Sequence, residues 1–176
     1  GENERLNLAL LSRVRPHHVR QLGFYNLGGK GRPARGSLAA EFDLGDGSSL
    51  LVYGIHLKSN FGEMPRNQAQ RAIALHQIAA DAVSEKLQND PDPTSVLILG
   101  DTNVDPDTEA FADDPSLEPL AGSFVDLWRG RPIEERTTIP TRLAGETGDP
   151  LLVFPPSAFD RIFASKNLVA RGPWRV

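Results

Sequence analysis

The sequence predicts an α/β fold, a sheet with helical cover, from three features of its hydrophobic pattern. The apolar run Val96–Leu99, between Pro93 and Gly100, predicts a strand buried on both faces. Residues 38–57 follow the pattern of a hairpin, and residues 66–87 carry apolar side chains at three- and four-residue steps, as an amphipathic helix does. Because this helix connects two strands, it predicts a βαβ crossover within one sheet.

Length and composition are those of one ordinary globular domain. The 176 residues are 39% hydrophobic and 24% charged, with no apolar run near the roughly 18 residues of a spanning helix. The absence of cysteine excludes disulfides and thiolate metal sites. A net charge of −4 gives no general attraction to nucleic acid, so a phosphate partner requires a local cationic patch. The first residues lack a signal-peptide pattern, and compartment and oligomeric state stay open.

The N-terminal part begins with a predicted strand at Leu6–Ser12. His17 and His18 follow in a polar region, where adjacent side chains point opposite ways, and we expect them to be exposed. The segment Asn26–Gly36 is glycine-rich and basic but lacks P-loop spacing. We expect it to be a connection first and a substrate-contacting loop second.

The hairpin and the helix bring two polar residues to one sheet edge. A turn at residues 45–48 separates the two strands, and the second strand ends at His56. Pro65 suits the first turn of the helix, and residues 89–93 end it. If the flanking strands are parallel neighbours, His56 and Asp101 emerge at the same edge. A hydrogen-bonded core histidine is the alternative for His56 alone.

Asp101 and Asn103 stand where the buried strand ends. Open sheets with helical cover bind ligands at the carboxyl ends of their strands. An Asx-type turn explains the same residues without function, because Asp and Asn side chains accept hydrogen bonds from local backbone donors. On this stretch alone both interpretations stay open.

The remaining chain is rich in turns, and we expect its acidic residues at 105–118 to be solvated. A short helix is predicted around Thr108–Ala112, a short amphipathic piece at Phe124–Trp128, and a long loop over residues 129–156. Residues 157–165 then form a strand-like run around Asp160. A carboxylate flanked by Phe159 and Ile162 is costly to bury without partners.

Taken in order, these pieces resemble the endonuclease/exonuclease/phosphatase family. The matching pieces are the strand at Leu8–Ser12, His56-Leu57-Lys58-Ser59, a helix bearing Arg66 and Gln70, Gly100-Asp101-Thr102-Asn103, Phe124–Trp128 and Phe159–Phe163. Thr102 replaces the aromatic residue of the usual Gly-Asp-Phe-Asn signature. The resemblance implies a DNase I-like two-sheet sandwich with flanking helices, present in part, over one domain of residues 1–176.

The resemblance also implies a metal-dependent phosphoesterase that acts on a phosphodiester or phosphomonoester. Asp101 would orient or deprotonate water, Asn103 would hold phosphate or metal, and His56 would bind a non-bridging oxygen. Asp160 would fix a partner histidine or tyrosine, or hold the phosphate region in order. Asp101 and Asn103 would be ligands of magnesium, or of manganese, since hard cations prefer oxygen. Lys58 and Arg35 would contact substrate. Nucleic acid is allowed as a substrate, although the net charge does not indicate it.

Two departures from the family pattern bear on activity. The Asn strand and the Gln-Glu strand that normally precede these motifs are not found before Leu6, and no Ser-Asp-His segment follows Asp160. We therefore expect a chain truncated at both ends, which by itself would neither bind metal tightly nor turn over substrate, whereas a full-length parent could do both. The alternative function is a non-catalytic binding or scaffold domain that keeps the fold without a complete metal site. An unrelated hydrolase is disfavoured because the chain has neither a Gly-x-Ser-x-Gly elbow nor a cysteine.

Overall fold

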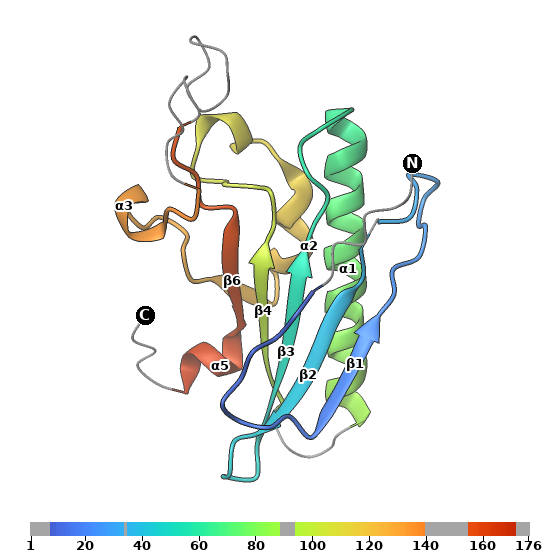
Figure 1. Cartoon of the computed structure of the whole chain (residues 1–176), viewed down its shortest axis with the longest axis vertical. Coiled ribbons are helices and arrows are strands. Elements are labelled where there is room, and N and C mark those ends of the chain that lie inside the picture. Colours follow the sequence, from blue (N-terminus) through green and yellow to red (C-terminus); the bar gives the residue numbers. More distant parts are fainter. Residues whose placement is uncertain (1–7, 34, 89–93, 140–154, 172–176) are drawn as a thin grey trace.

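The computed structural model describes residues 8–33, 35–88, 94–139 and 155–171. They form a six-stranded mixed sheet in the order β1-β2-β3-β4-β6-β5 (Figure 1). Its strands are β1 (His18–Leu22), β2 (Ser37–Asp43), β3 (Ser49–His56), β4 (Ser95–Asp101), β5 (Phe124–Asp126) and β6 (Asp160–Ser165). The predicted α/β class is confirmed, and the described residues contain one sheet of the predicted two.

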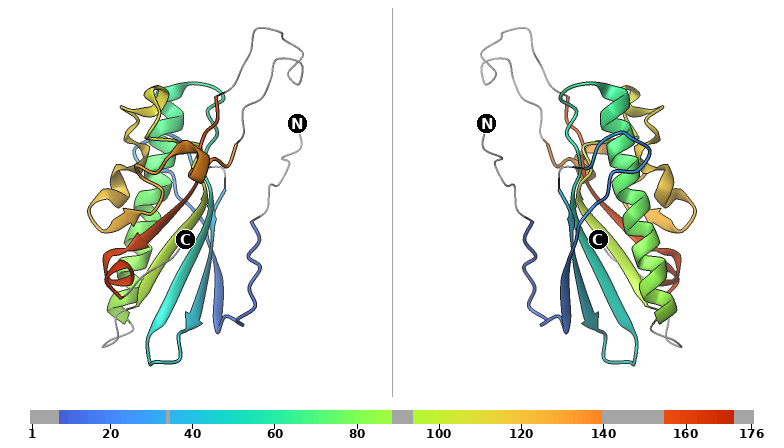
Figure 2. Two further views of the ribbon diagram at one scale, coloured as in Figure 1. Left: turned by 90° about the vertical axis from the view of Figure 1, so that its left-hand side faces the viewer. Right: turned by 90° about the vertical axis from the view of Figure 1, so that its right-hand side faces the viewer.

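Helix α1 (Met64–Gln88) is the crossover between β3 and β4 and packs on one face of the sheet (Figure 2). It starts two residues before the predicted boundary, with Pro65 in its first turn. Leu75 and Ile78 are fully buried against Tyr53 and Ile98 of the sheet. This layer of helix on sheet forms the larger part of the hydrophobic core.

Shorter helices complete the same layer and the connections. They are two 3₁₀ turns, Glu109–Phe111 and Pro115–Leu117, and α2 (Glu118–Ala121), α3 (Ile133–Arg136) and α5 (Lys166–Ala170). The first turn lies within the predicted helix 108–112, and α3 interrupts the predicted loop 129–156. Residues 89–93 and 140–154, which include the predicted helix stop and part of that loop, lie outside the described residues.

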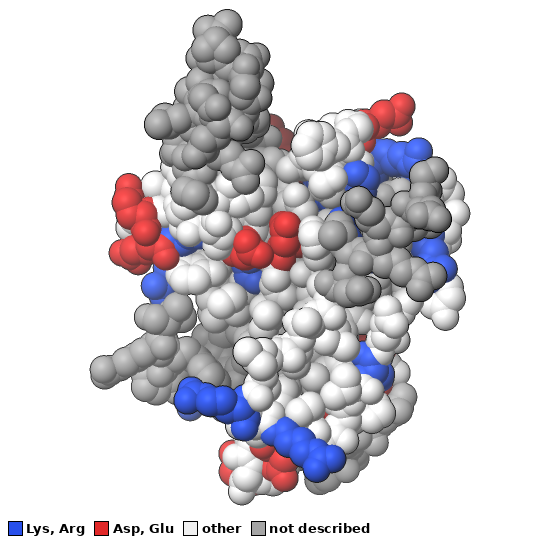
Figure 3. Space-filling view, in the orientation of Figure 1, with Lys and Arg blue, Asp and Glu red and all other residues white. Residues whose placement is uncertain are grey.

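The opposite face of the sheet carries a smaller apolar cluster. Ala40, Phe42 and Val52 are buried there, and Leu97 and Leu99 pack beside them. Leu10, from the segment that runs along this face, also contacts the cluster (Figure 2). Figure 3 views the molecule from this side, and few charged side chains lie over its centre.

The hairpin is confirmed, but the first predicted strand is wrong in its described part. β2 and β3 pair antiparallel around the turn at residues 45–48. Residues 8–12 have no regular structure, and the first strand is β1, which pairs with β2. The predicted exposure of His17 and His18 is confirmed, because β1 is an edge strand whose backbone pairing does not require apolar side chains.

None of the helices in the described part of the chain has the length and apolar character needed to cross a bilayer.

We expect Ile78→Ala to lower the free energy of unfolding by about 2–5 kcal/mol, because it leaves a cavity between α1 and the sheet. Val83 lies on the same helix but is 55% exposed. The matched Val83→Ala change should therefore stay within about 0.5 kcal/mol. Urea unfolding followed by circular dichroism measures both. Equal losses in the two variants would contradict the packing described here.

Candidate functional site

Three polar residues from three strands align at one edge of the sheet. In the parallel pair β3–β4, His56 is the register partner of Asp101, and in the antiparallel pair β4–β6, Asp101 is the partner of Asp160. Register partners point to the same face of a sheet. The three side chains therefore lie together on the face opposite α1, as the crossover predicted for His56 and Asp101.

His56 and Asp101 are in direct contact. Nε2 of His56 lies 3.4 Å from Oδ2 of Asp101, and the two side chains are 31% and 29% exposed. Burial raises the pKa of Asp101, and the nearby Asp160 carboxylate raises it further, against the opposing effects of the Asn103 amide and His56. A half-buried carboxylate with a raised pKa is suited to accept a proton from water.

Asn103 lies in an Asx turn with Asp101. Its backbone has a φ of 55°, and its N–H donates to Oδ1 of Asp101 at 2.8 Å, which is the Asx turn expected from the sequence. Its Nδ2 donates to the carbonyl of Leu57 at 3.2 Å. Asn60 donates to the carbonyl of Asn103 at 2.9 Å. These contacts hold the amide beside the ends of β3 and β4.

Thr102, the departure from the usual family signature, is fully buried between the two strand ends. Its backbone N–H and its hydroxyl both donate to the carbonyl of Phe159, at 2.7 and 2.8 Å. The residue between Asp101 and Asn103 is thus tied to the residue before Asp160. The phenylalanine of the usual signature would have no hydroxyl to make the second bond.

Asp160 and Arg161 point to opposite faces. Asp160 is exposed, whereas Arg161 is fully buried on the α1 side. The carboxylate of Asp160 therefore does not bear the burial cost expected from its apolar neighbours. Its backbone N–H and that of Phe159 donate to the hydroxyl of Thr138 at 3.1 Å each.

Of the two predicted cationic contacts, Arg35 lies beside His56 and Lys58 bonds to the loop that follows β3. Arg35 donates from Nη1 to the carbonyls of His56 and Leu57 at 3.2 and 3.1 Å. Nζ of Lys58 donates to the carbonyls of Ser59 and Phe61. Burial lowers the pKa of Lys58, and the charges of Arg35 and other nearby arginines lower it further.

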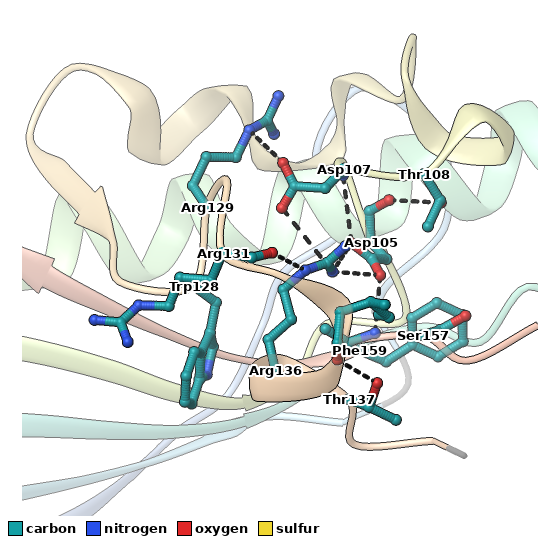
Figure 4. Close-up of polar contacts among 12 residues, drawn as sticks. Asp105, Asp107, Thr108, Trp128, Arg129, Arg131, Arg136, Thr137, Ser157 and Phe159 are labelled. Atoms are coloured by element: carbon teal, nitrogen blue, oxygen red, sulfur yellow. Dashed lines mark hydrogen bonds and ion pairs between the residues drawn. The ribbon is translucent and has the colours of Figure 1, made fainter. Parts of the chain in front are cut away.

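The prediction that the acidic residues after Asn103 are solvated is wrong for Asp105 and Asp114. Asp105 is fully buried, and Arg136 contacts both of its carboxylate oxygens (Figure 4). Burial alone would raise the pKa of Asp105, but the hydrogen bonds from Arg136 and from the backbone N–H of Ala158 outweigh it and the pKa is lowered. Asp114 pairs at 2.8 Å with Arg71, itself fully buried. These partners are 31 and 43 residues away in the chain, so no local sequence pattern indicates them.

The donor atoms at the edge have the right chemistry for magnesium but do not complete a site. Asp101, Asn103 and Asp160 offer oxygen atoms, which magnesium prefers. The described residues contain no group of three or more His, Asp or Glu side chains that could hold a metal ion.

The fold and the aligned edge agree with a known class of protein. The sequence profile of the Endonuclease/Exonuclease/phosphatase family matches residues 2–176, and the chain belongs to this family. Among curated proteins no sequence matches the chain.

Solved structures of similar fold include three enzymes or enzyme domains. Sphingomyelinase C from Streptomyces griseocarneus has a TM-score of 0.59 at 19% identity, over 88% of this chain and 51% of that one. The human Nocturnin catalytic domain has a TM-score of 0.56 at 12% identity, over 86% and 48%. Truncated Caenorhabditis elegans TDP2 has a TM-score of 0.55 at 16% identity, over 85% and 53%. This chain thus spans about half the length of the structures that it matches.

Gly100 sets how closely the two central strands approach at the site. Its φ is +133°, and a Cβ atom there would lie 2.1 Å from the carbonyl oxygen of Ile55. We expect Gly100→Ala to cost more than about 2 kcal/mol of unfolding free energy, from overpacking and backbone strain together. Thermal and urea unfolding measure the loss.

The matched control is Gly122→Ala. A Cβ atom at Gly122 meets nothing within 4 Å, and its φ of −76° is open to alanine. This variant should unfold within about 0.5 kcal/mol of the wild type. A Gly100→Ala protein of unchanged stability would show that the strands do not need this close contact.

Proposed function

We propose that the protein hydrolyses phosphate esters, with the aligned edge of β3, β4 and β6 as its reaction site. The observation that carries this proposal is the register that places His56, Asp101 and Asp160 on one face, within a chain of the Endonuclease/Exonuclease/phosphatase family. Phosphoryl transfer requires positioning and charge stabilisation more than covalent catalysis. A line of fixed polar groups at a strand edge meets that requirement.

Asp101 is the proposed base that orients and deprotonates the attacking water. Its carboxylate is oriented by the Asn103 N–H, and its pKa is raised by burial. His56, 3.4 Å away, donates to a non-bridging phosphate oxygen when protonated and stabilises the developing charge. Asn103 presents its amide to the phosphate. Asp160, on the other side of Asp101 from His56, is proposed to hold the phosphate region in a fixed arrangement.

Magnesium is the proposed cofactor, with manganese as a substitute. Asp101 and Asn103 supply oxygen ligands, and the remaining ligands would come from water and from groups outside the described residues. Magnesium commonly keeps several waters and uses only one or two carboxylates. When bound, it would withdraw charge from the phosphate oxygens.

Lys58 and Arg35 are proposed to attract the anionic substrate to the site. Arg35 contacts the backbone of His56, and the repulsion between Arg35 and Lys58 that contributes to the lowered pKa of Lys58 would be relieved by an anion. The substrate is a phosphodiester or phosphomonoester: a nucleic acid, a phospholipid head group or a small molecule. Measuring binding against salt concentration separates these classes, because nucleic acid binding falls steeply with salt.

Hydrolysis of bis(p-nitrophenyl) phosphate by the intact gene product tests the activity. We expect release of p-nitrophenol with magnesium or manganese, none with EDTA, and a loss of about 10²- to 10⁴-fold in kcat for Asp101→Asn. The matched control is Asp46→Asn, in the exposed turn between β2 and β3 at the other end of the sheet, which should leave kcat unchanged. No hydrolysis by the wild type with any metal would reject the phosphoesterase and leave a non-catalytic binding domain.

Lys58→Ala should raise KM about tenfold, since a hydrogen bond to a charged group is worth about 1.5 kcal/mol or more. The effect should shrink at high salt, because salt screens the attraction. Lys166 lies at the far end of β6 and donates to the carbonyl of Gly122. Lys166→Ala is therefore the matched control, and steady-state kinetics at two salt concentrations compare the variants. An equal KM for the wild type, Lys58→Ala and Lys166→Ala would show that Lys58 does not contact the substrate.

A further inference from the structure

An ionic cluster lies directly behind the aligned edge, and it is largely buried except for the Arg129 side chain, which is 57% exposed. Its carboxylates are Asp105, Asp107 and Asp126, and its guanidinium groups are Arg129, Arg136 and Arg161. Figure 4 shows Asp105 and Asp107 with Arg129 and Arg136. Three negative and three positive charges meet within one cluster. The proposed reaction uses none of them.

Asp105 is the centre of this cluster. Nη1 of Arg136 lies 2.6 Å from each of its carboxylate oxygens, and the backbone N–H of Ala158 donates to Oδ2 at 2.9 Å. Asp105 is fully buried and Arg136 is only 6% exposed. One carboxylate thereby joins the loop after β4, helix α3 and the segment that leads into β6.

Arg161 joins the cluster from the back of β6. Its Nη1 lies 3.4 Å from Oδ1 of Asp105 and donates to the carbonyl of Ala158 at 3.2 Å, while its Nε donates to Asp126 at 2.8 Å. Neighbouring residues of a strand point to opposite faces. Asp160 therefore faces the site while Arg161, the next residue, anchors the same strand end from behind.

The contacts fall on both sides of the site residues. Asp105 comes two residues after Asn103, and Ala158 comes two residues before Asp160. Between them, Thr102 donates twice to the carbonyl of Phe159. Side-chain and backbone hydrogen bonds thus connect the segment that carries Asp101 and Asn103 to the strand end that carries Asp160.

Stability alone does not account for such a cluster. Burying ions costs free energy that their pairing only partly returns, and apolar residues of the same volume often serve stability as well. Hydrogen-bonded ion pairs have a fixed geometry, and they therefore fix the relative orientation of the elements that carry them. Here those elements are the two halves of the proposed site.

We propose that Asp105 and Arg136 are positioning residues, which hold Asp101 and Asn103 at a fixed distance from Asp160. This inference rests on the proposed phosphoesterase activity, and its effect is on catalysis through geometry, since neither residue faces the site. Small displacements of reacting groups are costly to rate and need not change ground-state binding.

The test compares Arg136→Met and Arg136→Lys in the intact gene product. Arg136→Met should lower kcat about 10- to 100-fold with KM nearly unchanged, because the loop loses its fixed position. Arg136→Lys keeps a charge that reaches Asp105, and it should recover most of the lost kcat. The substrate is again bis(p-nitrophenyl) phosphate.

A second measurement does not depend on activity. The amide of Thr102 is bonded to Phe159, so its hydrogen exchange reports whether the two segments stay joined. Exchange at Thr102 should accelerate in Arg136→Met by about tenfold relative to the amide of Ile98 within β4, which reports general destabilisation. In Arg136→Lys the ratio should stay close to that of the wild type.

The matched control is Arg20→Met. Arg20 pairs with Asp81 and Glu85 between β1 and α1, away from the aligned edge. This variant loses an arginine pair too, but it should keep both kcat and the exchange ratio. A fall in kcat as large as that of Arg136→Met would show that lost stability, not position, is responsible, and would overturn the proposal.

The outcomes separate the two proposals. An active wild type whose Arg136→Met variant keeps its kcat, or loses kcat without faster exchange at Thr102, overturns the positioning role. Should Arg136→Met fail to fold, Asp105→Asn, which keeps an acceptor for Ala158, replaces it in both measurements. An inactive wild type rejects the phosphoesterase itself, and the exchange ratio then decides alone whether the cluster holds the loop.

Discussion

The parallel pairing of β3 and β4 is the constraint on which the rest of the structure depends. Parallel neighbours cannot be joined by a tight turn, so the chain must leave the sheet, cross one face and return. Helix α1 makes this crossing and buries its apolar side against the sheet as it does so. The same pairing sets His56 beside Asp101, and Gly100 lets the two backbones approach there.

The elements with strong periodic patterns could be predicted from the sequence. The hairpin, α1 and β4 each have an apolar pattern that matches their geometry, and the meeting of His56 and Asp101 follows from their connection. β1 could not be predicted, because a polar edge strand such as His18–Leu22 is stabilised by backbone bonds to β2 and not by a buried face. The apolar segment before it instead packs irregularly through Leu10.

The buried ion pairs cannot be predicted from the sequence either, for a related reason. Asp105 and Asp114 lie among prolines and other acidic residues, and such stretches are usually solvated. Their partners Arg136 and Arg71 are remote in the chain, so only the folded arrangement brings the charges together. The local apolar pattern therefore predicts the strand ends at which the proposed reacting groups lie. The supporting groups depend on contacts between residues distant in the chain, which no periodic pattern indicates. Thr102 belongs to this second kind, since its bonds to Phe159 cross 57 residues.

The opposite orientations of Asp160 and Arg161 at the start of β6 restrict the register in which β6 can pair with β4. Asp160 faces the site and Arg161 faces the ionic cluster, and a strand has a side-chain period of two. A slip of β6 by one residue along β4 would exchange them, placing a cation beside Asp101 and an acid among the carboxylates behind the sheet. Both faces would then carry the wrong sign at once. Charge as well as hydrophobicity thus specifies the strand register. The register decides the sign of the charge on both faces of this edge together.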